Sequence, residues 1–101
     1  MILVDTSVWI DHLRAGDAFL AESLDARRVL THTFIIGELA LGHIRQRDVI
    51  LTALLALPRA EVAQEAEVLR FIDHKSLFGR GIGYVDAHLL AAARLTAEAE
   101  F

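Results

Sequence analysis

The sequence predicts an α/β fold in which a short parallel sheet is flanked by helices. Two observations lead to this prediction: apolar runs of strand length recur along the chain, and segments with helical spacing separate them. The 101 residues contain no linker, repeat or low-complexity tract. We therefore expect residues 1–101 to form a single domain that is large enough to bury a sizeable core.

The first strand is expected at residues 1–4, because four consecutive apolar side chains suit a parallel sheet that is covered on both faces. Ser7 is expected to be the N-cap of a helix through residues 8–13, which should end near Gly16. Ligands of parallel sheets bind at the carboxyl ends of the strands. Asp5 directly follows the first strand and therefore stands at such an end.

The middle of the chain predicts a second strand among three helices. A weaker helix is expected over residues 17–26, and a short strand over residues 28–32. Residues 33–44 predict another helix despite their β-branched residues and glycines. A longer helix over residues 48–57 should end at Pro58, the only proline in the chain, because proline breaks a helix.

The last third of the chain predicts a short strand over residues 61–63 and a helix over residues 64–74. A loop with three glycines, residues 78–83, then leads into a final helix from Tyr84 to about Leu95. Three residues are expected on one apolar face of the 64–74 helix: Ala66, Leu69 and Ile72.

Composition excludes several classes of protein. The chain has no cysteine, which excludes disulfides, thiolate metal sites and a cysteine nucleophile. The net charge of −4 argues against a general electrostatic DNA binder, which would carry a basic surface. The apolar runs are far shorter than a membrane span, and the N-terminus lacks the features of a secretory signal. We therefore expect a cytoplasmic protein with no membrane association.

Three acids stand alone in the three most apolar stretches. Asp5 is the only charged residue in MILVDTSVWI, Glu38 is the only charge in TFIIGELALG, and Asp86 is the only carboxylate in GIGYVDAHLLAAA. Glu38 and Asp86 are therefore expected within or beside apolar helix faces. Their helical neighbours are all apolar residues or glycine, namely Phe34, Ile35, Leu41 and Gly42 for the first and Ile82, Gly83, Leu89 and Leu90 for the second.

A shared metal site explains all three acids together. Two carboxylates about 4 Å apart repel by roughly 4 kcal/mol at an effective dielectric constant near 20, and a divalent cation turns this repulsion into attraction. Oxygen ligands select Mg²⁺ or Mn²⁺ over zinc, and such sites carry out metal-assisted phosphodiester hydrolysis. Each acid taken alone also has a structural explanation: a helix cap for Asp5, a first helical turn for Asp86, and the edge of an apolar face for Glu38.

The three acidic segments together resemble one known family. LVDTSVWID at residues 3–11, TFIIGELALG at 33–42 and GRGIGYVDAHLLAAA at 79–93 resemble the PIN-domain ribonucleases, and most closely the VapC toxins of bacterial type II toxin–antitoxin modules. The resemblance covers nearly the whole chain in order, and the three motifs in combination are specific. It implies a PIN-like three-layer fold, with a short parallel sheet flanked by helices.

The resemblance also implies an activity and the residues that carry it. The family consists of endoribonucleases that depend on Mg²⁺ or Mn²⁺ and cleave RNA, often tRNA or rRNA. Its catalytic, metal-binding acids correspond to Asp5, Glu38 and Asp86 of this sequence. The hydroxyl that often lies close to the metal corresponds to Thr6, and Ser7 follows as a second supporting residue.

Partners are implied by the same resemblance. Members of the family form homodimers, and a VapB antitoxin blocks them. The C-terminal segment of the antitoxin packs on the toxin and can place a basic residue in the acidic pocket. We therefore expect a homodimer that binds RNA and a VapB-type antitoxin.

The C-terminus departs from the family pattern. Family members usually continue past the last helix into another strand that carries a fourth acid, in a segment resembling WTRD, whereas this chain ends in LTAEAEF. Neither Glu98 nor Glu100 is assigned the fourth role. We therefore expect a fold that lacks the C-terminal strand segment and exposes a sheet edge. The alternative function is a catalytically weak PIN-like domain that binds an antitoxin or another protein.

Other motifs do not indicate a different chemistry. Arg80, in the glycine-rich loop, is a candidate for contact with phosphate or with a partner's carboxylate, and a solvated arginine is the alternative. That loop lacks the Lys-Ser/Thr of a P-loop. Haloacid dehalogenase-type enzymes also begin with a strand and an aspartate, in a motif of the form D-x-D-x-T. In this sequence Ser7 stands where the second aspartate of that motif should be. The five histidines lack HExxH-type spacing and are expected at the surface or in satisfied positions: His12, His32, His43, His74 and His88.

Overall fold

The computed structural model describes residues 1–96 and 99–101. In these residues no helix is long and apolar enough to cross a membrane. The elements follow one another in an order typical of an α/β protein: β1 (Ile2–Leu3), α1 (Thr6–Ala15), α2 (Ala18–Asp25), β2 (Val29–Leu30), α3 (Thr33–Leu41), α4 (Arg47–Leu55), α5 (Glu65–His74) and α6 (Tyr84–Leu95).

The sheet is small, parallel and built from segments that are far apart in the sequence. β1 pairs with β2, with Ile2 opposite Val29. Single parallel bridges extend this pairing on both sides, from Ile2 to Glu100 and from Thr31 to Arg59. Four segments therefore run side by side, which confirms the predicted α/β fold with its short parallel sheet.

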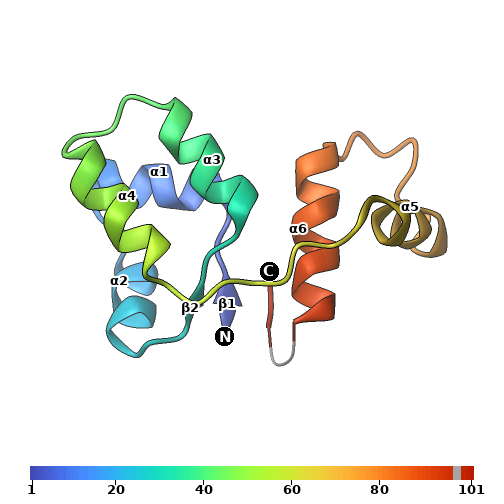
Figure 1. Cartoon of the computed structure of the whole chain (residues 1–101), viewed down its shortest axis with the longest axis horizontal. Helices are drawn as coiled ribbons and strands as arrows, with labels where there is room; N and C mark the ends of the chain where they lie inside the picture. The colour runs from blue at the N-terminus through green and yellow to red at the C-terminus, as the bar shows by residue number, and fades with distance from the viewer. Residues whose placement is uncertain (97–98) are drawn as a thin grey trace.

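Helices flank the sheet in two groups. In Figure 1, α1 to α4 gather above and to the left of the strands, and α5 and α6 stand to the right. Within these groups α1 packs on α3, α3 packs on α4, and α5 packs on α6. One core joins the first group to the strands and to α6: Leu3, Val4, Trp9, Leu20, Val29, Leu30, Ile35, Leu39, Leu54, Ala60, Leu89, Ala92 and Ala93.

Small side chains allow α6 to be packed from two directions. Leu89, Ala92 and Ala93 belong to the main core, whereas Ala87 and Ala91 belong to a second cluster shared with α5. Alanines on two faces let the neighbouring elements approach the helix closely at the density of a normal interior. This double packing fixes the position of α6 relative to the sheet.

The first helix begins at Thr6, so the prediction of Ser7 as its N-cap was wrong. Asp5 occupies the N-cap position with extended backbone, and its carbonyl accepts the N–H groups of Val8 (3.1 Å) and Trp9 (3.2 Å). Ser7 lies within the first turn of α1. The helix starts earlier than predicted, and the hydroxyl of Ser7 donates to the carboxylate of Asp5 instead of capping the helix.

Two helix ends have clear local causes. α1 ends at Ala15, before Gly16, whose φ of 81° lies in a region that glycine adopts without strain. α3 ends at Leu41, three residues before the predicted end at residue 44. The side chain of Arg47 donates to the carbonyl of Ala40 through Nε (3.1 Å) and Nη2 (2.8 Å), which satisfies a carbonyl at this helix end.

The strand predicted over residues 61–63 was wrong. Among the described residues, this part of the chain joins the sheet only through the bridge between Arg59 and Thr31. The backbone N–H of Glu61 donates instead to the hydroxyl of Thr96, at 2.9 Å, next to the end of α6. A side-chain acceptor has thus replaced the strand partner.

The face that α5 buries agrees with the predicted one at Ile72 and differs from it at Ala66 and Leu69. Val68 is fully buried, and Phe71 and Ile72 pack against the same cluster. Leu69 is 50% exposed, and Ala66 is exposed as well. Val68 and Phe71 pack beside Ile72 in place of Ala66 and Leu69, because a valine and a phenylalanine bury more apolar area than an alanine and a leucine.

Residues 99–101 lie beside β1, at the edge that was expected to be exposed. The N–H of Leu3 donates to the carbonyl of Glu100 (2.6 Å), and the N–H of Glu100 donates to the carbonyl of Met1 (3.0 Å). The edge of β1 is therefore paired at this point, through a single parallel bridge between Ile2 and Glu100. Glu98 lies outside the described residues.

Candidate active site

Asp5 lies where β1 passes into α1, at the carboxyl end of the strand. Its side chain makes no capping hydrogen bond to the helix, so a side-chain cap does not explain this carboxylate. Instead, the carboxylate accepts a hydrogen bond from the hydroxyl of Ser7, with 2.6 Å between Oγ and Oδ2. Ser7 therefore orients the carboxylate of Asp5, which is a different role from the predicted helix cap.

Thr6 connects this strand end to the second acid. The Oγ1 of Thr6 donates to Oε1 of Glu38 at 2.7 Å, from the first residue of α1 to the middle of α3. The side chain of Glu38 is exposed and stands next to the buried Leu39. Glu38 thus lies beside the apolar face of its helix, where one carboxylate oxygen is held by a neighbouring hydroxyl.

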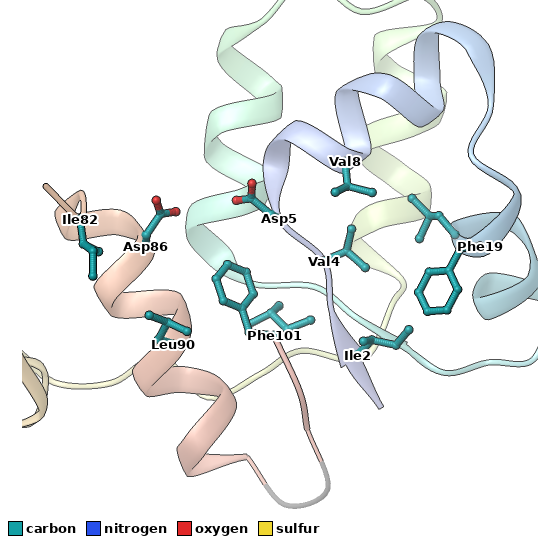
Figure 2. Close-up of a pocket in the computed structure, with 11 residues that line it drawn as sticks. Ile2, Val4, Asp5, Val8, Phe19, Ile82, Asp86, Leu90 and Phe101 are labelled. Atoms are coloured by element: carbon teal, nitrogen blue, oxygen red, sulfur yellow. The ribbon is translucent and has the colours of Figure 1, made fainter. Parts of the chain in front are cut away.

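Asp86 reaches the site from the opposite direction. It is exposed and lies in the first turn of α6. Figure 2 shows the carboxylates of Asp5 and Asp86 pointing toward one another from the ends of β1 and α6. Both acids line one cavity of about 520 Å³, which we call the Asp5–Asp86 hollow. Its remaining lining is apolar: Ile2, Leu3, Val4, Val8, Phe19, Leu20, Ile82, Leu90 and Phe101.

The structure thus brings Asp5 and Asp86 together and connects Glu38 to them indirectly. Glu38 lines a separate hollow between α1 and α3, and Thr6 bridges from the Asp5 side to its carboxylate. Within the described residues, no three side chains of the His, Cys, Asp or Glu type are grouped closely enough to hold a metal ion. The arrangement is a facing pair of acids, Asp5 and Asp86, and a third acid, Glu38, that is hydrogen-bonded to Thr6, the residue after Asp5.

Among the residues that the structure describes, none of the three acids forms an ion pair. In residues 1–96 and 99–101 the only ion pair joins Arg47 to Asp48, at 3.9 Å. The atoms at this site that could bind a metal are carboxylate and hydroxyl oxygens, which suit Mg²⁺ or Mn²⁺ better than zinc. Proteins typically hold Mg²⁺ with one or two carboxylates plus waters and phosphate, so a facing carboxylate pair fits such an ion.

Arg80 stands apart from the acids. It lies in the connection between α5 and α6, between Gly79 and Gly81, both of which have positive φ angles. Its side chain is exposed and does not line the Asp5–Asp86 hollow. The structure therefore places Arg80 on the loop that precedes the helix of Asp86, and within the described part of the chain the two side chains form no ion pair.

Sequence reasoning missed a row of four rings, of which His32 and His88 are buried. The ring of Phe34 contacts His32 (centroids 5.1 Å apart) and His88 (4.8 Å), and His88 also contacts Tyr84 (4.7 Å). His32 is the N-cap of α3, where its Nδ1 accepts the N–H of Phe34 at 2.9 Å. The row connects the start of α3 to α6, and thus the helix of Glu38 to the helix of Asp86.

Both histidines of this row are buried, so the expectation of surface or satisfied positions holds for them only in part. Within the described residues, Nε2 of His32 and Nδ1 of His88 have no hydrogen-bond partner. Burial, and secondarily the charge of His88, lower the pKa of His32 below 6.5. The available sequence signal was the position of His32 between a strand and the helix that follows it, where N-caps occur.

The chain is similar to known proteins over nearly its whole length. The PIN domain family matches residues 2–100. Two relatives bear the name Ribonuclease VapC32, from Mycobacterium tuberculosis strains CDC 1551 / Oshkosh and ATCC 25618 / H37Rv. Each is 53% identical over 95 residues, which cover 94% of this chain and 77% of the relative. No solved structure matches the chain significantly.

Proposed function

The chain belongs to the PIN-domain family, among its VapC-type ribonucleases, and we propose that it is an endoribonuclease toxin that uses Mg²⁺ or Mn²⁺ to hydrolyse tRNA or rRNA. The observation that carries this proposal is the facing pair of Asp5 and Asp86, at the carboxyl end of a parallel strand (Figure 2). Both acids lack an ion-pair partner among the described residues, so their charge is available for a cation.

Each residue of the site has a separate role in this proposal. Asp5 and Asp86 would hold the cation, which when bound would shield the charge of the phosphate and lower the pKa of water. Ser7 keeps the Asp5 carboxylate in one orientation through its 2.6 Å hydrogen bond. Thr6 fixes Oε1 of Glu38, so that Oε2 can accept a hydrogen bond from the attacking water.

Replacement of either facing acid should abolish cleavage. We expect Asp5→Asn and Asp86→Asn each to reduce RNA cleavage by at least about a hundredfold, because each removes a charge that binds the cation and leaves a neutral side chain of the same shape. Cleavage of structured RNAs by antitoxin-free protein, with Mg²⁺ or Mn²⁺ and with EDTA, measures this. Asp73→Asn on the exposed part of α5 is the control. Full cleavage by both site variants would contradict the proposal.

The same assay distinguishes the alternative function, a catalytically weak domain that binds other proteins. One observation favours that alternative: Glu38 lines a different hollow from Asp5 and Asp86, so the described side chains form no three-acid group. A wild-type protein that binds its antitoxin tightly but cleaves no RNA with either metal would support the binding module.

We also propose that a VapB-type antitoxin covers the Asp5–Asp86 hollow. Below its two acids the hollow is apolar, and Phe19 on its wall is 65% exposed. A partner segment with apolar side chains and one arginine or lysine would match this combination. The resemblance to VapC toxins further supports a homodimer in the cytoplasm, and light scattering of the purified protein measures the number of chains.

Phe19 should therefore contribute to antitoxin binding. We expect Phe19→Ser to weaken binding of the antitoxin by about ten- to a hundredfold, because a large aromatic anchor is lost from the interface. Val49→Ser on α4 is the matched control, since Val49 is 64% exposed and does not line the hollow. Titration calorimetry with the purified antitoxin compares the two variants. Equal affinities would exclude this wall as the binding surface.

A further inference from the structure

A second cavity, of about 660 Å³, adjoins the acid site on its other side. It lies between α1, α3 and the residues that connect α3 to α4, and we call it the Arg14–Arg45 hollow. Glu38 belongs to its wall and also accepts a hydrogen bond from Thr6, so the hollow shares one acid with the candidate active site. Its complete lining is Ile10, Leu13, Arg14, Glu38, Leu39, Gly42, His43, Ile44 and Arg45.

The hollow gathers two arginines and a histidine that are not used elsewhere. Arg14, His43 and Arg45 are exposed, and the described part of the chain offers none of them a hydrogen bond or an ion pair through the side chain. Arg47, only two residues beyond, contrasts with them: it is committed to the carbonyl of Ala40 and lies near Asp48. The protein as a whole has a net charge of −4, so a general basic surface does not explain this concentration.

The rest of the lining suits a nucleotide. Ile10, Leu13, Leu39 and Ile44 provide an apolar wall, against which a base or a ribose can lie. The imidazole of His43 can stack on a base, as single-stranded RNA binders use aromatic and histidine rings. Arginine presents planar, bidentate donors that match phosphate oxygens.

We propose that the Arg14–Arg45 hollow binds a nucleotide of single-stranded RNA next to the cleaved bond, with its phosphate on Arg14 and Arg45 and its base against the apolar wall. The inference rests on the proposed function, because the RNA strand must pass Glu38. Every nucleotide carries a negative charge, and the uncompensated acids repel the phosphates that flank the cleaved bond. Two arginines beside Glu38 offset that repulsion, which favours RNA over an acidic protein segment.

Binding, measured without cleavage, tests this inference. The probe is a short single-stranded RNA labelled with fluorescein, titrated in EDTA so that it stays intact. We expect Arg14→Ala and Arg45→Ala each to weaken binding roughly tenfold, through the loss of a charged hydrogen-bond donor. The double variant should also lower the slope of log K against log salt by about 0.7, because the single-strand phosphate contact that both arginines make contributes about 0.7. Arg14→Lys should recover part of the affinity.

The chain offers a matched control for charge. Arg70 and Arg94 are also exposed and line a hollow with His74 and Glu67, between α5 and α6, away from the acids. Arg70→Ala/Arg94→Ala removes the same charge as Arg14→Ala/Arg45→Ala, so general electrostatics would affect both equally. Circular dichroism and thermal unfolding verify that all variants are folded.

The outcomes separate this inference from the proposed function. Equal RNA affinity of the two double variants overturns the inference, even if the wild type cleaves RNA and Asp5→Asn does not. Selective loss of RNA binding in Arg14→Ala/Arg45→Ala supports it, even if no cleavage is found with either metal. If that variant binds RNA like the control but loses the antitoxin, the hollow is a protein-binding surface and the inference is wrong.

Discussion

At the scale of single residues, three consecutive side chains organise the site. Asp5 supplies a carboxylate, Thr6 donates to Glu38, and Ser7 donates to Asp5. They can do this because Asp5 caps α1 with its backbone and not with its side chain. The short segment DTS, where β1 meets α1, thus supplies one acid of the site, and its two hydroxyls orient Asp5 and Glu38.

The hydroxyl of Thr6 should therefore matter for catalysis more than for folding. Thr6→Val keeps the shape but removes the donor to Glu38, so we expect cleavage to fall by about tenfold and stability by about 0.5–1.5 kcal/mol. Thr52→Val is the control, because Thr52 also donates, at 2.8 Å, but to the carbonyl of Asp48 within α4. Single-turnover cleavage and urea unfolding measure both effects. Equal cleavage rates for the two variants would show that Thr6 does not position Glu38.

At the scale of elements, the ring row couples the start of α3 to α6. His32 caps α3 while it remains buried, and Phe34 lies between it and His88. A buried histidine favours the neutral form, which lowers the pKa of His32 relative to the unfolded chain. The facing group from α6 is His88, whose charge lowers the pKa of His32 in the same direction.

Stability should consequently fall as the pH drops below about 6.5. Above that pH, His32 is neutral in both states; below it, the unfolded chain takes up a proton before the folded chain does, which favours unfolding. His32→Asn keeps an acceptor at the N-cap and should flatten this dependence. His74→Asn, at an exposed position of α5, is the control and should retain the wild-type slope. Urea unfolding at pH 7.5 and 5.5 measures the difference.

At the scale of the whole molecule, the two acids that face each other belong to different helical groups. Asp5 directly precedes α1, which belongs to one group of helices, and Asp86 lies in the first turn of α6, which belongs to the other group (Figure 1). Their relative position therefore depends on how α6 packs against the main core. Leu89 and Ala92 are fully buried in this packing.

Overpacking at Ala92 should affect both stability and activity. We expect Ala92→Leu to reduce the free energy of unfolding by about 1–3 kcal/mol, because the added carbons have no space in a dense core. The same change should displace α6 and lower cleavage. Ala21→Leu, at an exposed position of α2, is the matched control and should change neither quantity appreciably. Wild-type cleavage by a destabilised Ala92→Leu protein would show that Asp86 tolerates movement of its helix.

Most of the element order could be predicted from the sequence, because helix and strand patterns depend on neighbours within a few positions. The strand at residues 1–4, the last helix and the position of Asp5 at a strand end all follow from such patterns. The prediction of a third strand was wrong, and the predicted buried face of α5 was right only at Ile72. Both depend on contacts with α6: the Thr96 hydroxyl takes the N–H of Glu61, and the second cluster selects Val68.

The sequence by itself determined that three acids stand alone in apolar surroundings and that their segments match the PIN-domain ribonucleases. Only the tertiary structure decided that Asp5 and Asp86 face each other across one hollow, while Glu38 joins them through Thr6 and lines another. The reason is physical. Local spacing fixes the element on which an acid lies, but the packing between distant elements fixes the cavity that its carboxylate lines.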